Sequence, residues 1–178
     1  MATKSKRTRP VRAGEAHADF MLRAYYMELD AELRYDLLAD QMELHNNGAV
    51  ADMFRKLARV EAKHAQKILS QMRWKKAPGL PAAYAWQGFE APETVPADEP
   101  HYLMQPWHAL QLALRCEKQA QRYFERIVKA KPPARVLAAA REMAAEEAEH
   151  VRLIRDWLAR VPKPEPGWDR DPDPPQSS

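Results

Sequence analysis

The sequence predicts an all-α protein, a four-helix bundle with a long crossover between its second and third helices. All five glycines and all fifteen prolines fall outside four stretches. Both residues destabilise helix interiors, proline by about 3 kcal/mol and glycine by about 1 kcal/mol. Within each stretch, apolar residues recur at steps of three and four, the period of an amphipathic helix. The predicted helices are residues 15–46, 49–73, 107–131 and 134–161.

Each predicted helix carries acidic residues in the middle of its apolar stripe. The stripes run from Met21 to Met42, Phe54 to Leu69, Leu110 to Val128 and Ala140 to Leu158. In this order they include Glu28, then Glu61 with His64, then Glu117, then Glu147 with His150. A buried carboxylate without a partner costs several kcal/mol. These positions therefore require compensation by a charge, a hydrogen bond or a metal.

The connections between the helices predict two antiparallel hairpins. Asn46-Asn47-Gly48 is a helix stop followed by a cap, and Lys131-Pro132-Pro133 ends the third helix just before the fourth. The crossover, residues 74–106, can run the length of the bundle and so allows the second and third helices to be parallel. Its aromatic residues are expected to pin it to the bundle surface, with a substrate entrance or a dimer contact as alternatives. They are Tyr84, Trp86, Phe89 and Tyr102.

Outside the bundle domain, residues 15–161, two irregular tails are expected. Residues 1–14 hold five Lys and Arg and no acid, and residues 162–178 are rich in Pro and Asp. A basic head could contact nucleic acid, a membrane surface or an acidic partner, but a solvated, disordered tail is the preferred interpretation. Trp168 indicates that the C-terminal tail docks on the bundle.

Composition excludes several classes of protein. No run of about 18 apolar residues is present, so a transmembrane helix is not expected. The first residues lack the apolar core of a secretory signal, which predicts a cytoplasmic protein. The single cysteine, Cys116, excludes an intrachain disulfide and a four-cysteine iron site.

One spacing occurs twice in the chain, as Glu61-x-x-His64 and Glu147-x-x-His150. At about 3.6 residues per turn, positions i and i+3 share a face, so each pair can offer a carboxylate and an imidazole to one point. The preceding helix of each hairpin supplies one more glutamate, Glu28 or Glu117. A single Glu-x-x-His is usually a surface pair, whereas two matched copies on apolar stripes favour a metal site.

The predicted ligand set suits two divalent ions. Four glutamates carry four negative charges and two neutral imidazoles add none, so two divalent cations balance the site. Carboxylates and imidazoles favour iron or manganese, including a mixed pair, and zinc is a weaker fit. The predicted metal ligands are Glu28, Glu61, His64, Glu117, Glu147 and His150. No catalytic residue beyond the metal centre is predicted.

Several neighbouring residues have more than one interpretation. Glu32 could be an additional or alternating ligand, but a solvated helix edge is preferred. Tyr35 could bond a ligand carboxylate or relay an electron, although filling the core is preferred. The off-stripe residues of the fourth helix are interpreted as a solvated face. They are Glu142, Glu146 and Glu149.

The complete ligand frame resembles the rubrerythrin branch of the ferritin-like di-iron carboxylate superfamily. The frame consists of Glu28-x-x-Ala31-x-x-x-Tyr35, Glu61-x-x-His64, Glu117-x-x-Ala120-x-x-x-Phe124 and Glu147-x-x-His150. The resemblance implies a ferritin-like four-helix bundle with one crossover and two iron ions held by the six ligands. It also implies a non-haem oxidoreductase acting on peroxide, dioxygen or ferrous iron.

Three departures from related families refine this expectation. Ala120 stands where rubrerythrins have a further glutamate, so peroxidase chemistry through exchange of that carboxylate is not implied. The chain has no rubredoxin-like segment, so an external electron donor protein is expected. Ala62 stands where bacterioferritins have a haem-binding methionine, so haem is not expected.

Other functions remain open at the level of sequence. A di-iron monooxygenase that hydroxylates an organic substrate is one alternative, and a non-enzymatic iron-binding or storage protein is another. The expected partners are an electron donor protein, peroxide or dioxygen as a small-molecule oxidant, and a second copy of the chain in a homodimer. Neither nucleic acid nor stable membrane insertion is expected.

Overall fold

The computed structural model describes residues 13–79 and 103–169 and confirms the all-α four-helix bundle. Its helices are α1 (Ala13–Leu44), α2 (Gly48–Met72), α3 (Pro106–Lys129) and α4 (Ala134–Leu158). The predicted ranges differ from these bounds by only a few residues at the ends. The predicted division into tails and bundle stays a prediction, because much of both tails lies outside the described residues.

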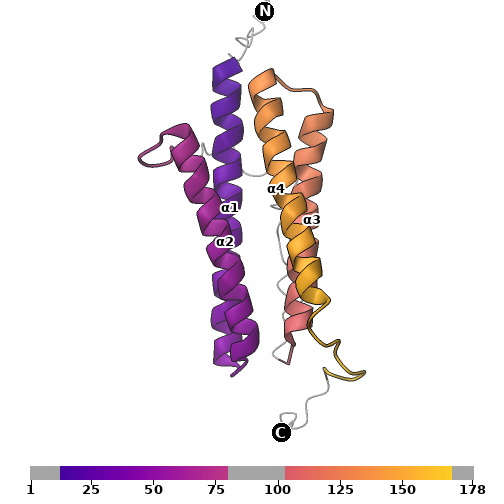
Figure 1. Ribbon diagram of the computed structural model, residues 1–178. Helices are drawn as coiled ribbons and strands as arrows, with labels where there is room; N and C mark the ends of the chain where they lie inside the picture. The colour runs from indigo at the N-terminus through magenta and orange to yellow at the C-terminus, as the bar shows by residue number, and fades with distance from the viewer. Residues whose placement is uncertain (1–12, 80–102, 170–178) are drawn as a thin grey trace, which may run out of the picture.

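The helices form two hairpins, α1 with α2 and α3 with α4. Figure 1 shows α1 and α4 running in one direction and α2 and α3 in the other. The backbones of the two hairpins approach each other through α1 with α4 and α2 with α3, and side chains of α2 and α4 also meet across the bundle. Because α2 and α3 are parallel, the end of α2 and the start of α3 lie at opposite ends of the bundle, which confirms the predicted crossover connection. The crossover aromatics Tyr84, Trp86, Phe89 and Tyr102 lie outside the described residues.

Local sequence explains where the helices begin and end. The side chain of Asn47 accepts a hydrogen bond from the Val50 N–H at the start of α2. Arg73 ends α2 in the left-handed region at φ 54°, and its N–H bonds the last carbonyls of the helix. Pro106 occupies the first turn of α3, where a missing N–H costs nothing.

The bundle core is divided into two apolar clusters. One joins the end of α1 and the start of α2 to the start of α3 and the end of α4, with Phe54 and Leu110 fully buried. The other joins the opposite ends of the four helices around Met27, Phe124 and Met143. All the predicted ligands lie along the helices between these clusters. The core therefore encloses a polar layer from both sides.

Residues just outside the helices also contact the bundle. The Tyr26 hydroxyl donates to the Pro78 carbonyl after α2, and the Asn47 side chain donates to the Met104 carbonyl before α3. The Trp168 ring lies against the His108 ring, with centroids 3.8 Å apart. The C-terminal segment thus docks on the bundle at this residue, as the sequence indicated.

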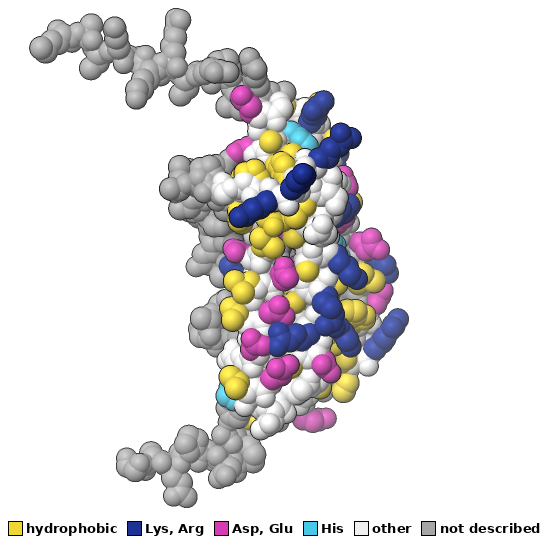
Figure 2. All heavy atoms as spheres, turned by 90° about the vertical axis from the view of Figure 1, so that its left-hand side faces the viewer, with side chains coloured by type: hydrophobic (Ala, Val, Ile, Leu, Met, Phe, Trp, Pro, Cys, Tyr) yellow, Lys and Arg dark blue, Asp and Glu magenta, His cyan; other side chains and the backbone are white. Residues whose placement is uncertain are grey.

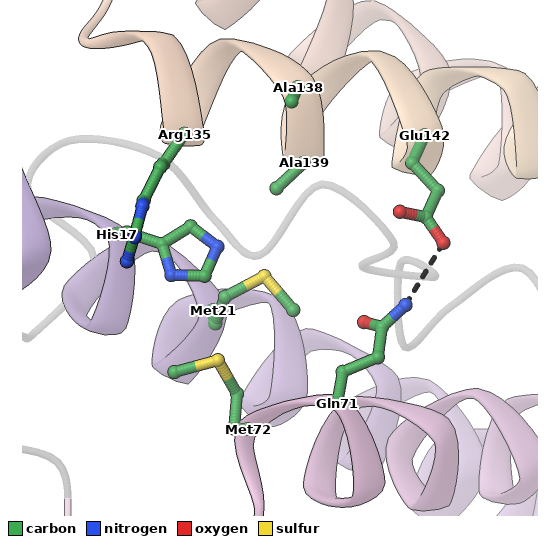
Figure 3. Close-up of a pocket in the computed structure, with 8 residues that line it drawn as sticks. All are labelled: His17, Met21, Gln71, Met72, Arg135, Ala138, Ala139 and Glu142. Carbon is green, nitrogen blue, oxygen red and sulfur yellow. Dashed lines mark hydrogen bonds between the residues drawn. The ribbon is translucent and has the colours of Figure 1, made fainter.

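The outer surface is that of a solvated bundle. Figure 2 shows a face on which Lys and Arg interleave with Asp and Glu in the lower half, and border apolar side chains in the upper half. No helix in the described part of the chain is long and apolar enough to cross a membrane. A cavity of about 270 Å³ opens where α1 and α4 begin and α2 ends, lined among others by His17, Met72 and Arg135 (Figure 3).

Candidate metal centre

Four carboxylates are buried in the polar layer between the two apolar clusters. Glu28 is 2% exposed, and Glu61, Glu117 and Glu147 are each 3% exposed. Among the described residues these are the buried charged side chains, and they are the four glutamates that the sequence places on apolar stripes. Burying four carboxylates is costly without compensation, so the layer requires positive charge.

In the α1/α2 half-site, the residues Glu28, Glu61 and His64, the imidazole faces both carboxylates. Nδ1 of His64 is 3.7 Å from Oε2 of Glu28 and 3.9 Å from Oε2 of Glu61. These separations exceed the length of a hydrogen bond. Nδ1 of His64 and Oε2 of Glu28 are both buried with no hydrogen-bond partner. Two unsatisfied polar atoms therefore face each other here.

In the α3/α4 half-site, the residues Glu117, Glu147 and His150, the same arrangement is tighter. Nδ1 of His150 is 3.1 Å from Oε2 of Glu117, within hydrogen-bond distance, and 3.6 Å from Oε2 of Glu147. The repeat seen in the sequence is thus a repeat in space. In each half-site Nδ1 of the histidine points at the two carboxylates of its own hairpin.

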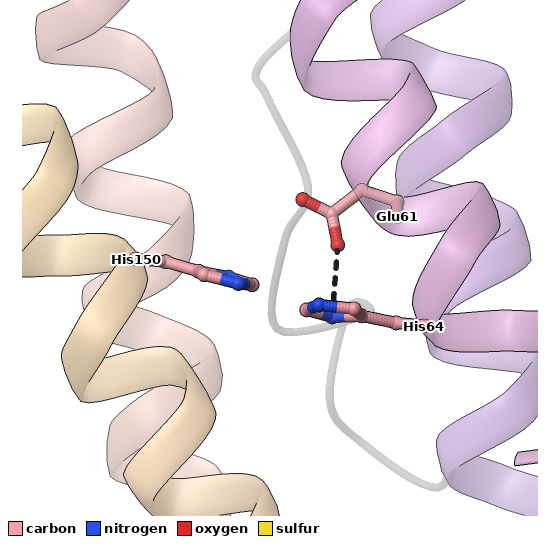
Figure 4. Close-up of side chains that lie close together, drawn as sticks. All are labelled: Glu61, His64 and His150. Carbon is pink, nitrogen blue, oxygen red and sulfur yellow. Dashed lines mark ion pairs between the residues drawn. The ribbon is translucent and has the colours of Figure 1, made fainter. Parts of the chain in front are cut away.

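The two half-sites meet through their histidines. The His64 and His150 rings stack with centroids 4.6 Å apart and planes inclined by 17° (Figure 4). Ligand atoms of Glu61, His64 and His150 lie within 4.8 Å of one another, and so do those of Glu117, Glu147 and His150. The first group crosses from one hairpin to the other, so the half-sites form one continuous centre.

Electrostatics in the α3/α4 half-site favour bound protons when no metal is present. Burial raises the pKa of Glu147 well above 4.5, and the carboxylates of Glu117 and Glu28 raise it further against the opposing effect of His150. Burial lowers the pKa of His150, but its hydrogen bond with Glu117 and the nearby carboxylate of Glu147 outweigh this and raise the pKa from 6.5 to about 10. Protons thus supply positive charge that a metal ion would replace.

The residues present fit divalent metal ions. Nitrogen and oxygen ligands lie about 2.0–2.2 Å from such ions, so neighbouring ligands of one ion are about 3–4 Å apart. The separations of 3.1–3.9 Å between the histidine Nδ1 atoms and the carboxylate oxygens match this spacing. An ion would also satisfy the two orphaned atoms Oε2 of Glu28 and Nδ1 of His64. The site can therefore hold metal through carboxylate oxygens and imidazole nitrogens.

The structure also shows where the residues lie for which the sequence left more than one interpretation. Tyr35 is buried and its ring stacks on the Phe54 ring, with centroids 6.1 Å apart, in the apolar cluster that contains Phe54 and Leu110. This position fits the interpretation that Tyr35 fills the core. Ala120 is fully buried where rubrerythrins have a further glutamate. Glu142 and Glu149 are exposed and Glu146 is half-buried, which agrees with their interpretation as a solvated face, and Glu142 and Glu146 also contact Lys67 of α2. Their spacing of four residues is the signal that could have revealed a shared partner.

The fold and the buried carboxylate and histidine layer define a class of protein, the ferritin-like four-helix bundles with candidate sites for two metal ions. The rubrerythrin family model matches residues 19–98, which include the α1/α2 half-site. The comparison with solved structures found an uncharacterised conserved protein from Magnetospirillum magnetotacticum MS-1. Its sequence is 35% identical to that of this chain, and the two structures align with a TM-score of 0.61. The match covers 83% of this chain and 97% of that one. Comparison with curated proteins gave no match.

The chain therefore carries a rubrerythrin-family domain over residues 19–98. The α3/α4 half-site lies beyond the residues matched by the family model, so the similar solved structure is what extends the likeness over most of the chain.

Proposed function

We propose that the protein is a non-haem di-iron oxidoreductase acting on peroxide, dioxygen or ferrous iron. The observation that carries this proposal is the pair of buried half-sites, each with two glutamates and one histidine Nδ1 directed at both carboxylates. The match of residues 19–98 to the rubrerythrin family model supports iron as the metal. Manganese, alone or with iron, fits the same ligands.

The chain's own residues would bind and balance the metal pair. Glu28, Glu61 and His64 would hold one ion, and Glu117, Glu147 and His150 the other. Two ferrous ions bound there would supply two electrons, which balance the reduction of one hydrogen peroxide and two protons to two waters. The two apolar clusters flank the layer and its four glutamates are buried, which strengthens the charge interactions among them.

One contact between a histidine and a carboxylate gives the site a place to store a proton. The hydrogen bond of 3.1 Å between Nδ1 of His150 and Oε2 of Glu117 can hold a proton in the metal-free protein. Metal binding would release it, because a ligating imidazole must be unprotonated at the bonding nitrogen. A separate electron donor protein would restore the reduced state, and a homodimer is part of the same proposal.

In the part of the chain that the structure describes, no observation favours the hydroxylase alternative to the same degree. A hydroxylase needs an apolar channel that brings an organic substrate to the metals. The cavity of about 270 Å³ is lined by none of the six candidate ligands and lies towards the end of the bundle (Figure 3). We therefore propose small oxidants rather than a large organic substrate.

Metal analysis of the purified protein and of two ligand variants tests the proposal. The parent should contain about two iron ions per chain, and Glu61→Ala and His150→Ala should lose most of this metal. Glu149→Ala removes an exposed carboxylate from the same turn of α4 but from the opposite, solvent-facing side, and should keep the parent content, which makes it the matched control. Equal iron in all four proteins would overturn the proposal.

The reaction is tested on protein loaded with ferrous iron in the absence of air. Addition of hydrogen peroxide should oxidise about two ferrous ions for each peroxide consumed, the ratio that the two-electron reduction requires. Consumption of peroxide without oxidation of bound iron would exclude this reaction. Oxidation by dioxygen alone, with no response to peroxide, would restrict the function to oxygen chemistry.

A further inference from the structure

A row of contacts joins the two hairpins along the seam between α2 and α4. On α2 the participating residues are three and then four positions apart, and on α4 they are four apart, so each set shares one helix face. The two helices run in opposite directions, which places the sets in matching order (Figure 1). The sets are His64, Lys67 and Gln71 on α2, and Glu142, Glu146 and His150 on α4.

The contacts run from the end of the bundle down to the metal centre. Nε2 of Gln71 donates to Oε1 of Glu142 at 3.0 Å, beside the cavity described above (Figure 3). The Lys67 ammonium then pairs with Glu142 at 3.1 Å and also with Glu146. The last step is the stack of His64 on His150 (Figure 4). Lys67 is therefore the cation that lies between the cavity and the two histidines.

Lys67 is one helical turn from His64, and Glu146 is one turn from His150. Glu142 and Glu146 are like charges four residues apart on α4, and they repel each other unless a cation lies between them. The Glu146 side chain is 23% exposed, which makes its contact with Lys67 more protected than an ordinary surface pair. The ammonium thus draws the acidic face of α4 against α2 next to the centre.

The position of the seam matters because one group of candidate ligands crosses it. Glu61 and His64 come from α2, whereas His150, which completes the group, comes from α4. Contacts within each hairpin are far more extensive than those between hairpins. The distance from His150 to the other two ligands therefore depends on how firmly α4 is held against α2.

We propose that Lys67 is a positioning residue for the metal centre, which holds His150 of one hairpin within ligand distance of Glu61 and His64 of the other. The inference rests on the proposed binding of metal by the six ligands. Lys67 touches no candidate ligand in these contacts, so its effect is exerted through the spacing of the helices. Without the ammonium, each half-site keeps its own three ligands, but the two halves move apart.

A matched control exists on the same helix. Arg55 of α2 pairs with Asp36 at 2.9 Å, with Asp40, and with Glu43 at 3.5 Å, all on α1. This cluster also consists of one cation and several carboxylates, but it lies within one hairpin. Arg55→Met should therefore resemble Lys67→Met in its effect on thermal stability, yet leave the spacing of the half-sites unchanged.

The experiment measures the release of ferrous iron from the full chain to a chelator without air, together with the magnetic coupling between the two ions. Lys67→Met should release iron about fivefold faster than the parent and show weaker coupling, in line with the energy of a partly exposed ion pair. Lys67→Arg should restore the parent rate to within about twofold, because it keeps the charge. Arg55→Met should release iron at the parent rate.

Release and coupling in Lys67→Met equal to those of the parent would overturn the inference, as would equal acceleration in Arg55→Met. If Lys67→Met does not fold, Glu146→Gln tests the same contact while keeping the shape of the side chain, and it should also accelerate release. A parent protein that retains no iron would instead contradict the proposed function. The two failures are therefore distinguishable.

Discussion

The two half-sites each contain two glutamates and one histidine, but they differ in how the polar atoms of these side chains are hydrogen-bonded. In the α3/α4 half-site, His150 is hydrogen-bonded to Glu117 at 3.1 Å. In the α1/α2 half-site the corresponding separation is 3.7 Å, and the facing atoms of Glu28 and His64 are buried without hydrogen-bond partners. A proton can thus substitute for metal in one half-site, whereas in the other the described residues give these two facing atoms no hydrogen-bond partner.

The comparison shows why a repeated sequence motif does not produce two equivalent sites. Unsatisfied buried polar atoms cost about 1–3 kcal/mol each, so the α1/α2 half-site is where metal has most to contribute to stability. The following predictions test this difference, beginning with the largest expected effect.

Metal loading should stabilise the whole protein strongly. A ligand at a thousand times its dissociation constant adds about 4 kcal/mol, which corresponds to a rise in Tm on the order of 10 °C for a chain of this size. Thermal unfolding with and without ferrous iron, in the absence of air, measures the rise. An unchanged Tm in the presence of bound iron would show that the buried carboxylates are satisfied without metal.

Replacing one glutamate in each half-site should have opposite effects on the metal-free protein. Glu28→Leu removes an unsatisfied buried atom and should raise the free energy of unfolding by about 1–3 kcal/mol. Glu117→Leu leaves His150 without its hydrogen-bond partner and should lower it by a similar amount. Chemical denaturation of metal-free samples provides both values, and changes of the same sign would contradict the comparison.

Stability of the metal-free protein should fall as the pH rises. The pKa of His150 is raised from 6.5 to about 10, and that of Glu147 is raised well above 4.5. The folded state therefore binds these protons more tightly than the unfolded state does. The contribution of His150 is complete below pH 6.5 and is lost as the pH rises through about 10, and that of Glu147 declines once the pH exceeds 4.5.

Because metal must displace the same protons, the gain in Tm on adding iron should grow over this pH range. Thermal unfolding at several pH values, with and without iron, measures both trends. His150→Ala removes one of the two protonated groups and should flatten the decline of the metal-free protein. A decline just as steep in that variant would show that other groups cause it.

The smallest effect is expected outside both half-sites. Arg152 of α4 pairs with Asp156 at 3.0 Å and with Glu149 at 3.8 Å, all on the exposed side of one helix. Arg152→Ala should lower the free energy of unfolding by less than about 0.5 kcal/mol and leave the iron content unchanged. Loss of iron in this variant would show that metal content responds to general changes in α4 rather than to the ligands.

The sequence predicted the fold because its strongest signals are local. Glycine and proline mark the limits of the helices, and the steps of three and four residues show which side of each helix is buried. The same periodicity placed Glu28 and Glu117 in the core and paired Glu61 with His64. A carboxylate on an apolar stripe is a signal that needs no knowledge of neighbouring helices.

Features that depend on the distance between helices could not be predicted in this way. The periodicity of α2 and α4 shows which residues share a face, but not that Lys67 meets Glu142 and Glu146. The difference between 3.1 Å and 3.7 Å in the two half-sites depends on how each pair of helices packs. Both half-sites have the same letters in the sequence, so only coordinates distinguish them.

The crossover has a consequence for the order of folding. Each hairpin joins residues close in sequence, for example Glu117 and His150, which are 33 positions apart, and such contacts form rapidly. Docking of one hairpin on the other must first close the long connection between parallel helices, and this closure carries an entropic penalty. Hairpin docking is therefore expected to limit the folding rate, and the stack of His64 on His150 should be among the last native contacts to form.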